Sequence, residues 1–169
     1  RGIGPALEAA DVLAVLRRAP GAPTDLRERA LDLAGRLLDL APGAESGEGR
    51  AQAETLLDTG AAEAKFLAIC AAQGGFHEPG EAPQRIAMTA GVSGYLTAID
   101  NRLIARIAKL AGAPRQQRAG VRLLVRVGEG VEKGQPLYEI HAETTGELAY
   151  ARVYAEAHIG ALTLSEDTA

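Results

Sequence analysis

The sequence predicts an α+β protein, in which an N-terminal helical packet precedes a C-terminal α+β domain. In about the first 75 residues, apolar positions recur at three- and four-residue steps, the spacing of one helix face. The segment FHEPGEAPQ, residues 76–84, then combines glycine, two prolines and charge, which is typical of a linker. Beyond it, short alternating runs are separated by glycine turns and helical patterns. We therefore expect a helical segment over residues 1–78, part of a larger α/β domain, and a C-terminal α+β domain over residues 84–169.

Four helices are expected in the first part. The first begins at Pro5, since proline suits the first helical position, and the second follows an N-cap at Thr24. The third runs from about Arg50 to Asp58 and is stopped by Gly60, and the fourth is ended by Gly74–Gly75. An apolar row follows the second helix and consists of Leu26, Ala30, Leu33, Leu37 and Leu40. Its acidic residues are interpreted as a solvated face: Asp25, Glu28, Asp32 and Asp39.

The second part is predicted to mix strands and helices. Short strands at residues 86–89 and 95–99 flank the turn Gly91–Gly94, and Asp100 or Asn101 caps a helix that ends near Gly112. Further strands are expected at residues 121–127 and 136–142, followed by a last helix capped by Thr145.

Composition excludes several classes of protein. Hydrophobic residues make up 47% and charged residues 24% of the 169 residues, as in an ordinary globular protein. A formal charge of −4 without clustered Lys and Arg argues against nucleic-acid binding. No run of about 18 apolar residues and no secretion signal is present, so we expect no membrane association and a cytoplasmic location. Cys70 is expected to be a buried, inert thiol.

The stretch VGEGVEKGQPLYEIHAET, residues 127–144, resembles the sequence pattern of the hairpins in biotin- and lipoate-carrying domains. Those domains place a modifiable lysine just after the second strand, here close to Ile140. Residues 141–145 contain no lysine, and Lys133 lies in the preceding turn. We therefore expect a structural, lipoyl-like glycine hairpin without a prosthetic group. Its positive-φ turns are assigned to Gly128, Gly130 and Gly134.

Four stretches, in this order, resemble one enzyme family: GPALEAADVLAVL, LLDTGAAEAKFLAICAAQGG, SGYLTAIDNRLIARIAKLAGAP and AGVRLLVRVGEGVEKGQPLYEIHAET. They are similar to the C-terminal part of thymidine and pyrimidine-nucleoside phosphorylases and of their relatives, the AMP phosphorylases. The run NRLIARIAKLAGAP and the ending IHAET favour the AMP-phosphorylase-like branch, whose bacterial members are usually labelled thymidine phosphorylase. The chain begins with Arg1 and a helix-entry signal at Gly4–Pro5, so we expect a piece of a longer protein.

The resemblance implies a pentosyltransferase of nucleotide salvage that is homodimeric when intact. Phosphate attacks the anomeric carbon of thymidine and releases thymine and 2-deoxyribose 1-phosphate; alternatively, AMP yields adenine and ribose 1,5-bisphosphate. In the family, the groups that hold phosphate and base lie N-terminal to the segment that Gly4–Pro5 resembles. We therefore expect no catalytic and no cofactor-binding residue in this chain, which would supply scaffold and cleft closure.

The resemblance also implies a cation site for K⁺ or Ca²⁺. An acidic side chain three residues after the Ala-Leu-Glu glutamate corresponds to Asp11, and the nearest backbone carbonyl contributor would be Gly2. Hard cations take such oxygen ligands. The family residue is a Glu, however, and an ordinary first-turn carboxylate near a helix N-terminus is the alternative role for Asp11.

Other candidate residues favour structural roles. The three histidines, His77, His141 and His158, have no spacing that would build a metal site or a catalytic pair. Arg115 and Arg118 could bind a phosphate, although arginines in such a segment more often lie in an exposed loop without a ligand. Two alternatives to the phosphorylase function, both non-catalytic, stay open. One is a non-catalytic lipoyl-like or hammerhead module that docks a partner, and the other is a scaffold whose helical packet dimerises through its second helix.

Overall fold

The computed structural model describes residues 1–41 and 47–165. Most of the loop expected at residues 41–49 therefore lies outside the described residues. Contacts divide the chain into two compact units. The α+β unit contains Arg1–Ala9 and Pro79–Ala169, and the helical unit contains Ala10–Glu78. Helix α1 (Pro5–Leu16) begins in the first unit and continues into the second.

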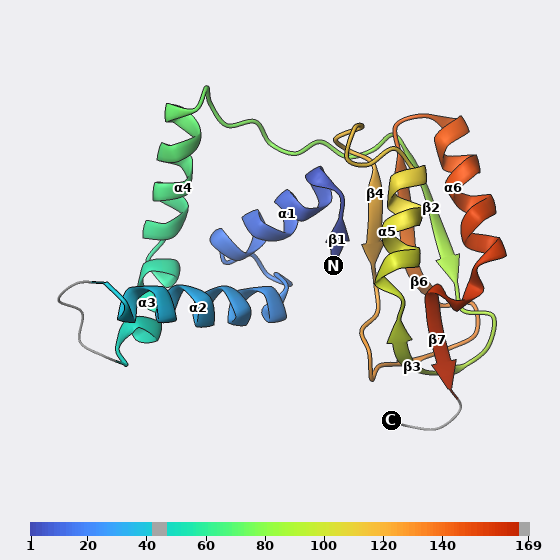
Figure 1. The fold of residues 1–169 in the computed structure, drawn as a ribbon, viewed down its shortest axis with the longest axis horizontal. Helices are drawn as coiled ribbons and strands as arrows, with labels where there is room; N and C mark the ends of the chain where they lie inside the picture. Colours follow the sequence, from blue (N-terminus) through green and yellow to red (C-terminus); the bar gives the residue numbers. More distant parts are fainter. Residues whose placement is uncertain (42–46, 166–169) are drawn as a thin grey trace. The chain divides into compact units, whose positions relative to one another are not determined.

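The α+β unit is built on two antiparallel sheets (Figure 1). The larger has the strand order β1 (Gly2–Ile3), β4 (Gly120–Leu123), β6 (Pro136–Ala142) and β2 (Gln84–Thr89). The smaller has the order β5 (Gly130–Val131), β3 (Gly94–Ile99) and β7 (Leu162–Ser165). A 3₁₀ turn, Ile159–Ala161, precedes β7.

Helices α5 (Asn101–Leu110) and α6 (Thr145–Ala157) lie side by side on one face of the larger sheet (Figure 1). Successive strand residues point to opposite faces, so one set of side chains faces these helices. Val121 pairs with Ile140, which pairs with Ile86, and all three belong to the core beneath α5 and α6. The register thus places one apolar row across three strands under the helices.

Both helices of this unit begin at side-chain caps. Asp100 Oδ1 accepts hydrogen bonds from the backbone N–H groups of Arg102 (2.8 Å) and Leu103 (3.0 Å), as predicted. Thr144, rather than the predicted Thr145, caps α6: its Oγ1 accepts from the Glu147 N–H and donates to the Glu147 carboxylate. The sequence carries Thr-x-x-Glu, the pattern of a capping box, at residues 144–147, and here the Glu147 carboxylate bonds to the hydroxyl of the cap residue.

Several strand predictions are wrong in detail. The strands predicted at residues 86–89 and 95–99 are found at Gln84–Thr89 and Gly94–Ile99, and they belong to different sheets. The strand expected to reach residue 127 ends at Leu123. Beyond it the chain turns toward the smaller sheet, where the Gly128 N–H donates to the carbonyl of Leu96 in β3 at 2.7 Å. Strands β1 and β7 were not predicted, because so few residues show no periodicity.

The helical unit contains the remainder of α1, α2 (Thr24–Asp39), α3 (Gly49–Asp58) and α4 (Ala61–Ala72). Thr24 is the first residue of α2 rather than its cap. Helix α2 packs on α3 through Gly35, where a Cβ would lie 2.7 Å from the Arg50 Cα. Glycine is needed there because the two helices approach so closely. Cys70, expected to be buried, is only half-buried on α4, which has no fully buried residue.

No helix within the described residues is long and apolar enough to cross a membrane.

Candidate functional site

The two residues of the predicted cation site lie in different compact units. Gly2 is in β1, opposite Arg122, and Asp11 is in the second turn of α1. The first-turn carboxylate of α1 is instead Glu8, whose Oε1 accepts a hydrogen bond from the Gly4 N–H at 2.9 Å. Asp11 therefore does not have the alternative role of a first-turn carboxylate. The cation site itself stays a prediction.

A hollow of about 380 Å³ lies at the start of α1 within the α+β unit. Glu8 and Lys109 are the charged residues among those that line it. Helix N-termini bind anions through unpaired N–H groups. Here, however, the Gly4 N–H donates to Glu8, and the Ala6 N–H donates to the Gln117 carbonyl at 2.9 Å. These two amides are therefore already used within the fold.

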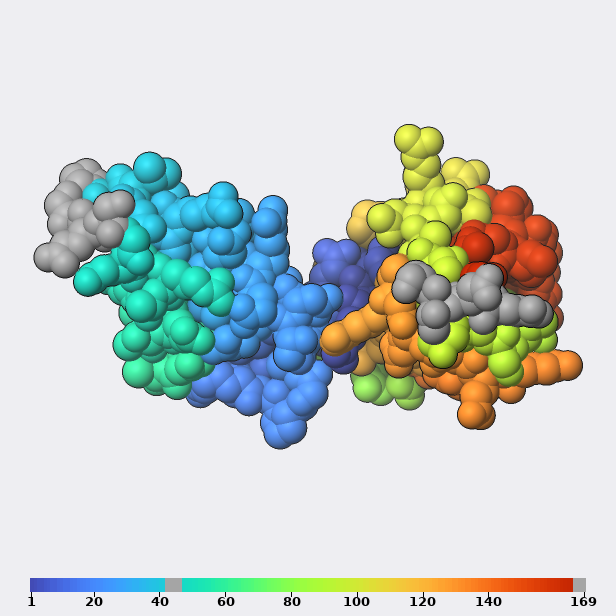
Figure 2. Space-filling model, turned by 90° about the horizontal axis from the view of Figure 1, so that it is seen from below, coloured from blue at the N-terminus to red at the C-terminus, as the bar shows by residue number. Residues whose placement is uncertain are grey.

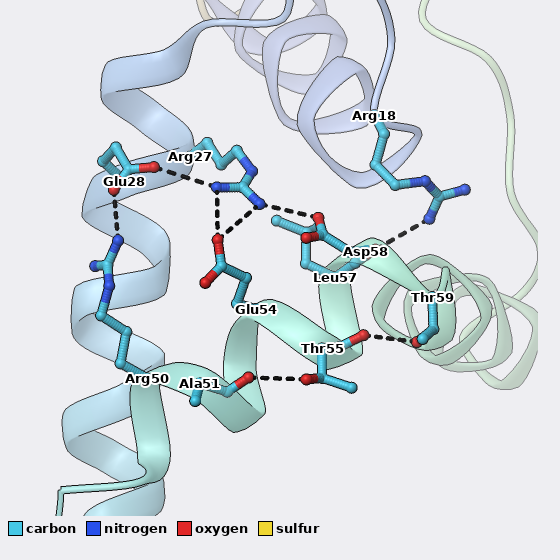
Figure 3. Close-up of polar contacts among 10 residues, drawn as sticks. All are labelled: Arg18, Arg27, Glu28, Arg50, Ala51, Glu54, Thr55, Leu57, Asp58 and Thr59. Atoms are coloured by element: carbon cyan, nitrogen blue, oxygen red, sulfur yellow. Dashed lines mark hydrogen bonds and ion pairs between the residues drawn. The ribbon is translucent and has the colours of Figure 1, made fainter.

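Arginine and carboxylate side chains connect α2 with α3 (Figure 3). Arg27 Nη2 donates to Asp58 Oδ1 at 2.9 Å and to Glu54 Oε1 at 3.3 Å, and Arg50 pairs with Glu28. The hydrogen bond with Asp58 raises the pKa of Arg27, and the hydrogen bond with Arg50 lowers the pKa of Glu28. The expected solvated face of α2 is therefore partly a helix–helix contact.

Two acidic residues of that face have further roles. Asp39 Oδ1 accepts from the Gly49 N–H at 2.8 Å, and so caps the start of α3 from the end of α2. Asp32 pairs within α2 with Arg29 and Arg36. Because the arginine pairs of this unit are largely exposed, solvent screens them and they add little to stability. Their main effect is to fix how the helices are aligned.

A hollow of about 360 Å³ beside this network includes Arg18, Arg27 and Asp58 among its lining residues. Arg18 adopts a positive φ of 55°, a conformation that usually selects glycine at a helix end. Its Nη1 donates to the Leu57 carbonyl at 3.0 Å, at the C-terminal end of α3 (Figure 3). Both arginines therefore bond to groups of α3, and their role at this hollow is to connect helices.

A row of titratable side chains crosses the face of the larger sheet that points away from α5 and α6. His141 is 4% exposed, and its Nε2 lies 3.3 Å from Glu139 Oε2. Arg85 lies opposite His141 on β2, and Arg122 lies opposite Glu139 on β4. Among the described residues, His141 Nδ1 and Arg122 Nε are buried without a hydrogen-bond partner. Burial lowers the pKa of His141, although Glu139 opposes the shift. The imidazole is therefore held neutral near pH 7.

The sequence did not predict that these side chains would lie together, although Glu139 and His141 are two residues apart on a predicted strand and therefore point to the same face. The other histidines lie elsewhere. His158 stacks on Tyr154, with ring centroids 3.9 Å apart, and its Nδ1 lies 2.8 Å from the Tyr154 carbonyl oxygen at the end of α6. His77 is exposed. In the described part of the chain, no group of three or more His, Cys, Asp or Glu side chains could hold a metal ion.

Arg118 is paired with a carboxylate. Its Nη2 lies 3.2 Å from Glu143 Oε2, and its backbone N–H donates to Glu143 Oε1 at 3.2 Å. The side-chain hydrogen bond lowers the pKa of Glu143. Arg115 is exposed. The structure thus uses Arg118 to tie the loop after α5 to the end of β6.

The glycine turns near the predicted hairpin are partly confirmed. Gly128 (φ 88°) and Gly134 (φ 86°) have positive φ, but Gly130 does not, because it lies in β5. The Lys133 backbone N–H donates to Ser93 Oγ at 2.9 Å, and this joins the turn to the loop before β3. The residues after β6, where carrier domains have their lysine, lead directly into the cap of α6.

Comparison with known proteins places these observations in a family. Residues 95–160 match the family described as Pyrimidine nucleoside phosphorylase C-terminal domain. The chain is 57% identical over 158 residues to a protein of Cupriavidus necator named "Putative thymidine phosphorylase 1". It is 51% identical over 168 residues to the "Putative thymidine phosphorylase" of Hahella chejuensis.

These matches cover 94% and 99% of the chain, but only 30% and 33% of the respective relatives. The chain thus spans about a third of the length of the curated relatives that it matches. Both compact units are included in the similarity, whereas the domain match lies entirely in the α+β unit. The chain belongs to the thymidine and pyrimidine-nucleoside phosphorylase family and represents its C-terminal part.

Proposed function

We propose that the chain is the C-terminal part of a thymidine phosphorylase, in which it supplies scaffold and cleft closure rather than catalytic groups. The observation that carries the proposal is the similarity over 94–99% of the chain to proteins named putative thymidine phosphorylases. In the proposed reaction, a phosphate oxygen forms a bond to C1′ of thymidine and the C1′–N bond breaks. The base leaves with the electron pair, takes up a proton and becomes thymine.

The charges of the described residues support a scaffold role. Phosphorolysis requires cations around phosphate and hydrogen-bond donors on the leaving base. Arg27 and Arg50 bind carboxylates of neighbouring helices, and Arg118 binds Glu143. Arg17 likewise pairs with Glu63 and Glu78. A guanidinium that is already neutralised in this way is a poor partner for a developing phosphate charge.

An AMP phosphorylase is a second candidate, which yields adenine and ribose 1,5-bisphosphate. Two segments favour it, NRLIARIAKLAGAP at residues 101–114 and IHAET at residues 140–144. The first forms α5 and its exit, and the second forms the end of β6 before α6. Neither segment has a described contact that selects one base, so the substrate preference would be set in the remainder of the enzyme.

Phosphate as co-substrate and a homodimeric assembly form part of the proposal. The cation, K⁺ or Ca²⁺, would be held by the Asp11 carboxylate and the Gly2 carbonyl. Ca²⁺ takes about six to eight oxygen ligands, so these two residues would be a minority of its ligands. The residues of this chain alone do not fit a complete cation site, and no step of the reaction is assigned to the cation.

The proposal is tested with the product of the complete gene. Purified protein is incubated with phosphate and either thymidine, uridine or AMP, and the released base is quantified by chromatography. We expect thymine release that depends on phosphate and is faster than release of uracil or adenine. Release of adenine alone would transfer the assignment to AMP phosphorylase, and no release from any of the three would contradict the phosphorylase function.

A further inference from the structure

Strand β2 is an open edge of the larger sheet. It stands last in the strand order and pairs on one side with β6. In an antiparallel strand with one neighbour, every second residue turns its N–H and C=O groups away from that neighbour. Among the described residues, no further strand pairs with β2, and no backbone hydrogen bond outside the sheet ladder involves residues 84–89. The free side of β2 is therefore a row of backbone donors and acceptors without a strand partner.

This edge has little protection against pairing with another strand. Natural proteins protect edge strands by keeping them short or by placing Lys, Pro or a bulge in them. Strand β1, at the opposite edge of the same sheet, has only two residues, whereas β2 has six. The β2 sequence, QRIAMT, contains no Lys and no Pro, and its register with β6 is regular from Gln84 to Met88. Its one charged side chain, Arg85, is already paired with Glu81 at 3.2 Å.

A second copy of β2 fits this edge in one register. When two copies of one strand pair antiparallel, residues at equal distances on either side of the two-fold axis lie opposite each other. An axis at Ile86 keeps the pairing within the regular part of β2 and places Arg85 opposite Ala87. An axis at Ala87 would bring Thr89 into the ladder, beyond the register shift that follows Met88. An axis at Arg85 would place two guanidinium groups opposite each other, which destabilises a sheet.

The helix layer is compatible with this pairing. Helix α6 lies over β6 and β2 (Figure 1). Since neighbouring strands lie about 4.8 Å apart, a helix midway between β6 and β2 lies about 5 Å from a two-fold axis at the free side of β2. The two copies of α6 would then lie about 10 Å apart, the separation of packed helices.

Helix α6 also has apolar side chains that a second copy can contact. Tyr150 is 69% and Val153 is 61% exposed. Figure 2 shows the atoms of α6, coloured orange-red, on the surface of the α+β unit. Aromatic and aliphatic side chains are typical of the buried centre of a protein interface. The sheet layer and the helix layer therefore both accommodate a second copy at the same edge.

We propose that β2 pairs antiparallel with β2 of a second copy of this chain, centred on Ile86, so that two four-stranded sheets join into one continuous sheet. Ile86, which packs partly buried against the core, would gain the Ile86 side chain of the other copy as its cross-strand neighbour. Pairs of β-branched residues at such positions stabilise antiparallel sheets. The inference goes beyond the proposed function, because it concerns an assembly surface of the α+β unit and requires no particular substrate.

The test reverses the sign of one charge on the free edge. Ala87, which is exposed, is changed to Lys in one variant and to Glu in the other. In the proposed dimer each residue 87 lies opposite Arg85 of the other copy, so Ala87→Lys adds two repulsive pairs and Ala87→Glu adds two attractive pairs. Sedimentation velocity of the 169-residue chain over a range of concentrations gives the dissociation constant. We expect the unchanged chain to dimerise, with a dissociation constant at least about tenfold larger for Ala87→Lys than for Ala87→Glu.

An effect on folding alone predicts the opposite order. Within one copy, Ala87 lies opposite Glu139 of β6, so Ala87→Lys should stabilise the folded chain and Ala87→Glu should destabilise it, as urea unfolding can measure. Adding Arg85→Glu to Ala87→Lys should restore the dimer, because opposite charges then face each other again.

A chain that stays monomeric at every concentration would overturn the inference. Equal dissociation constants for the two variants would also overturn it, because the dimer would then use another register or another surface. The same holds if Arg85→Glu fails to restore the dimer in the Ala87→Lys background.

Discussion

The two compact units bury their apolar residues to different extents. In the α+β unit, Ile140 and Ile107 are 0% exposed beneath two helices and a four-stranded sheet. Within the described part of the helical unit, the buried apolar cluster is small and consists of Val15, Leu31, Ala53 and Leu57. Helix α4 contributes no fully buried residue.

The difference agrees with the prediction from the sequence that the α+β unit is a domain in its own right and the helical unit part of a larger α/β domain, and that division stays a prediction. Hydrophobic burial is the dominant favourable term in folding, so a unit with few buried side chains depends on additional contacts. The match to a C-terminal domain family lies in the unit with the larger core. The exposed leucines of α2, Leu33 and Leu37, and Leu40 at its C-cap lie in the other unit.

The largest expected effect is in the core of the α+β unit. Ile140→Ala removes a fully buried side chain from the central strand and should lower the free energy of unfolding by about 2–5 kcal/mol. Ile159→Ala is the control, because Ile159 is 85% exposed, and should change it by less than about 0.5 kcal/mol. Urea unfolding followed by circular dichroism measures both. Similar small effects would mean that this unit lacks a cooperative core.

The next effect concerns the close approach of α2 and α3. In Gly35→Ala the new Cβ would lie 2.7 Å from the Arg50 Cα, so the helices must separate, at a cost of about 1–3 kcal/mol. Gly146→Ala is the matched control, since no heavy atom lies within 4 Å of its Cβ position in α6. Thermal unfolding compares the two. A Gly35→Ala variant as stable as the control would show that the α2–α3 contact is not formed as described.

A smaller effect compares one helix cap in each unit. Asp100→Ala removes the acceptor for two N–H groups of α5, and Asp39→Ala removes the acceptor at the start of α3. Each should cost about 1 kcal/mol, and Asp→Asn at either position should restore most of it. Hydrogen exchange at the first turn of each helix reports the loss locally. Unchanged protection at α3 in Asp39→Ala would show that Asp39 does not stabilise the start of that helix.

The smallest expected effect is the pH dependence that His141 gives to the α+β unit. Its folded-state pKa is lowered, mainly by burial, so below about pH 6.5 the unfolded chain binds a proton that the folded chain resists. Stability should therefore be fully present above that pH and fall as the pH drops toward the folded-state pKa. Melting temperatures between pH 7 and pH 5 should decline less in His141→Gln. Parallel declines in the two proteins would contradict this account of His141.

Much of the fold could be predicted from the sequence, because strong periodicity and turn residues specify local structure. The strand Pro136–Ala142 was predicted at its observed bounds, and the helix after Asp100 begins at its predicted cap. Strand pairing was not predictable in the same way. Strands β2 and β3 are neighbours in sequence but join different sheets, because tertiary contacts with β6 and β7 decide their partners.

Less of the candidate site could be predicted. The apolar row of α2 was identified correctly, but periodicity alone cannot tell which of two apolar faces a neighbouring helix covers. Leu31 and Gly35 make the contact with α3, and Leu26 of the predicted row packs against the buried cluster. Leu33, Leu37 and Leu40 of that row stay exposed. The pairing of Glu28 and Asp39 with α3 likewise depends on the helix–helix geometry. Gly2 and Asp11 as cation ligands remain a prediction from the family resemblance.

The most direct measurement of the central claim is base release by the 169-residue chain itself. The purified chain is incubated with thymidine and phosphate beside the complete gene product at equal molar concentration, and thymine is quantified over time. We predict phosphate-dependent thymine release from the complete protein and none above the protein-free control from the 169-residue chain. Turnover by the short chain would contradict the claim that it supplies scaffold to chemistry performed by the rest of the enzyme.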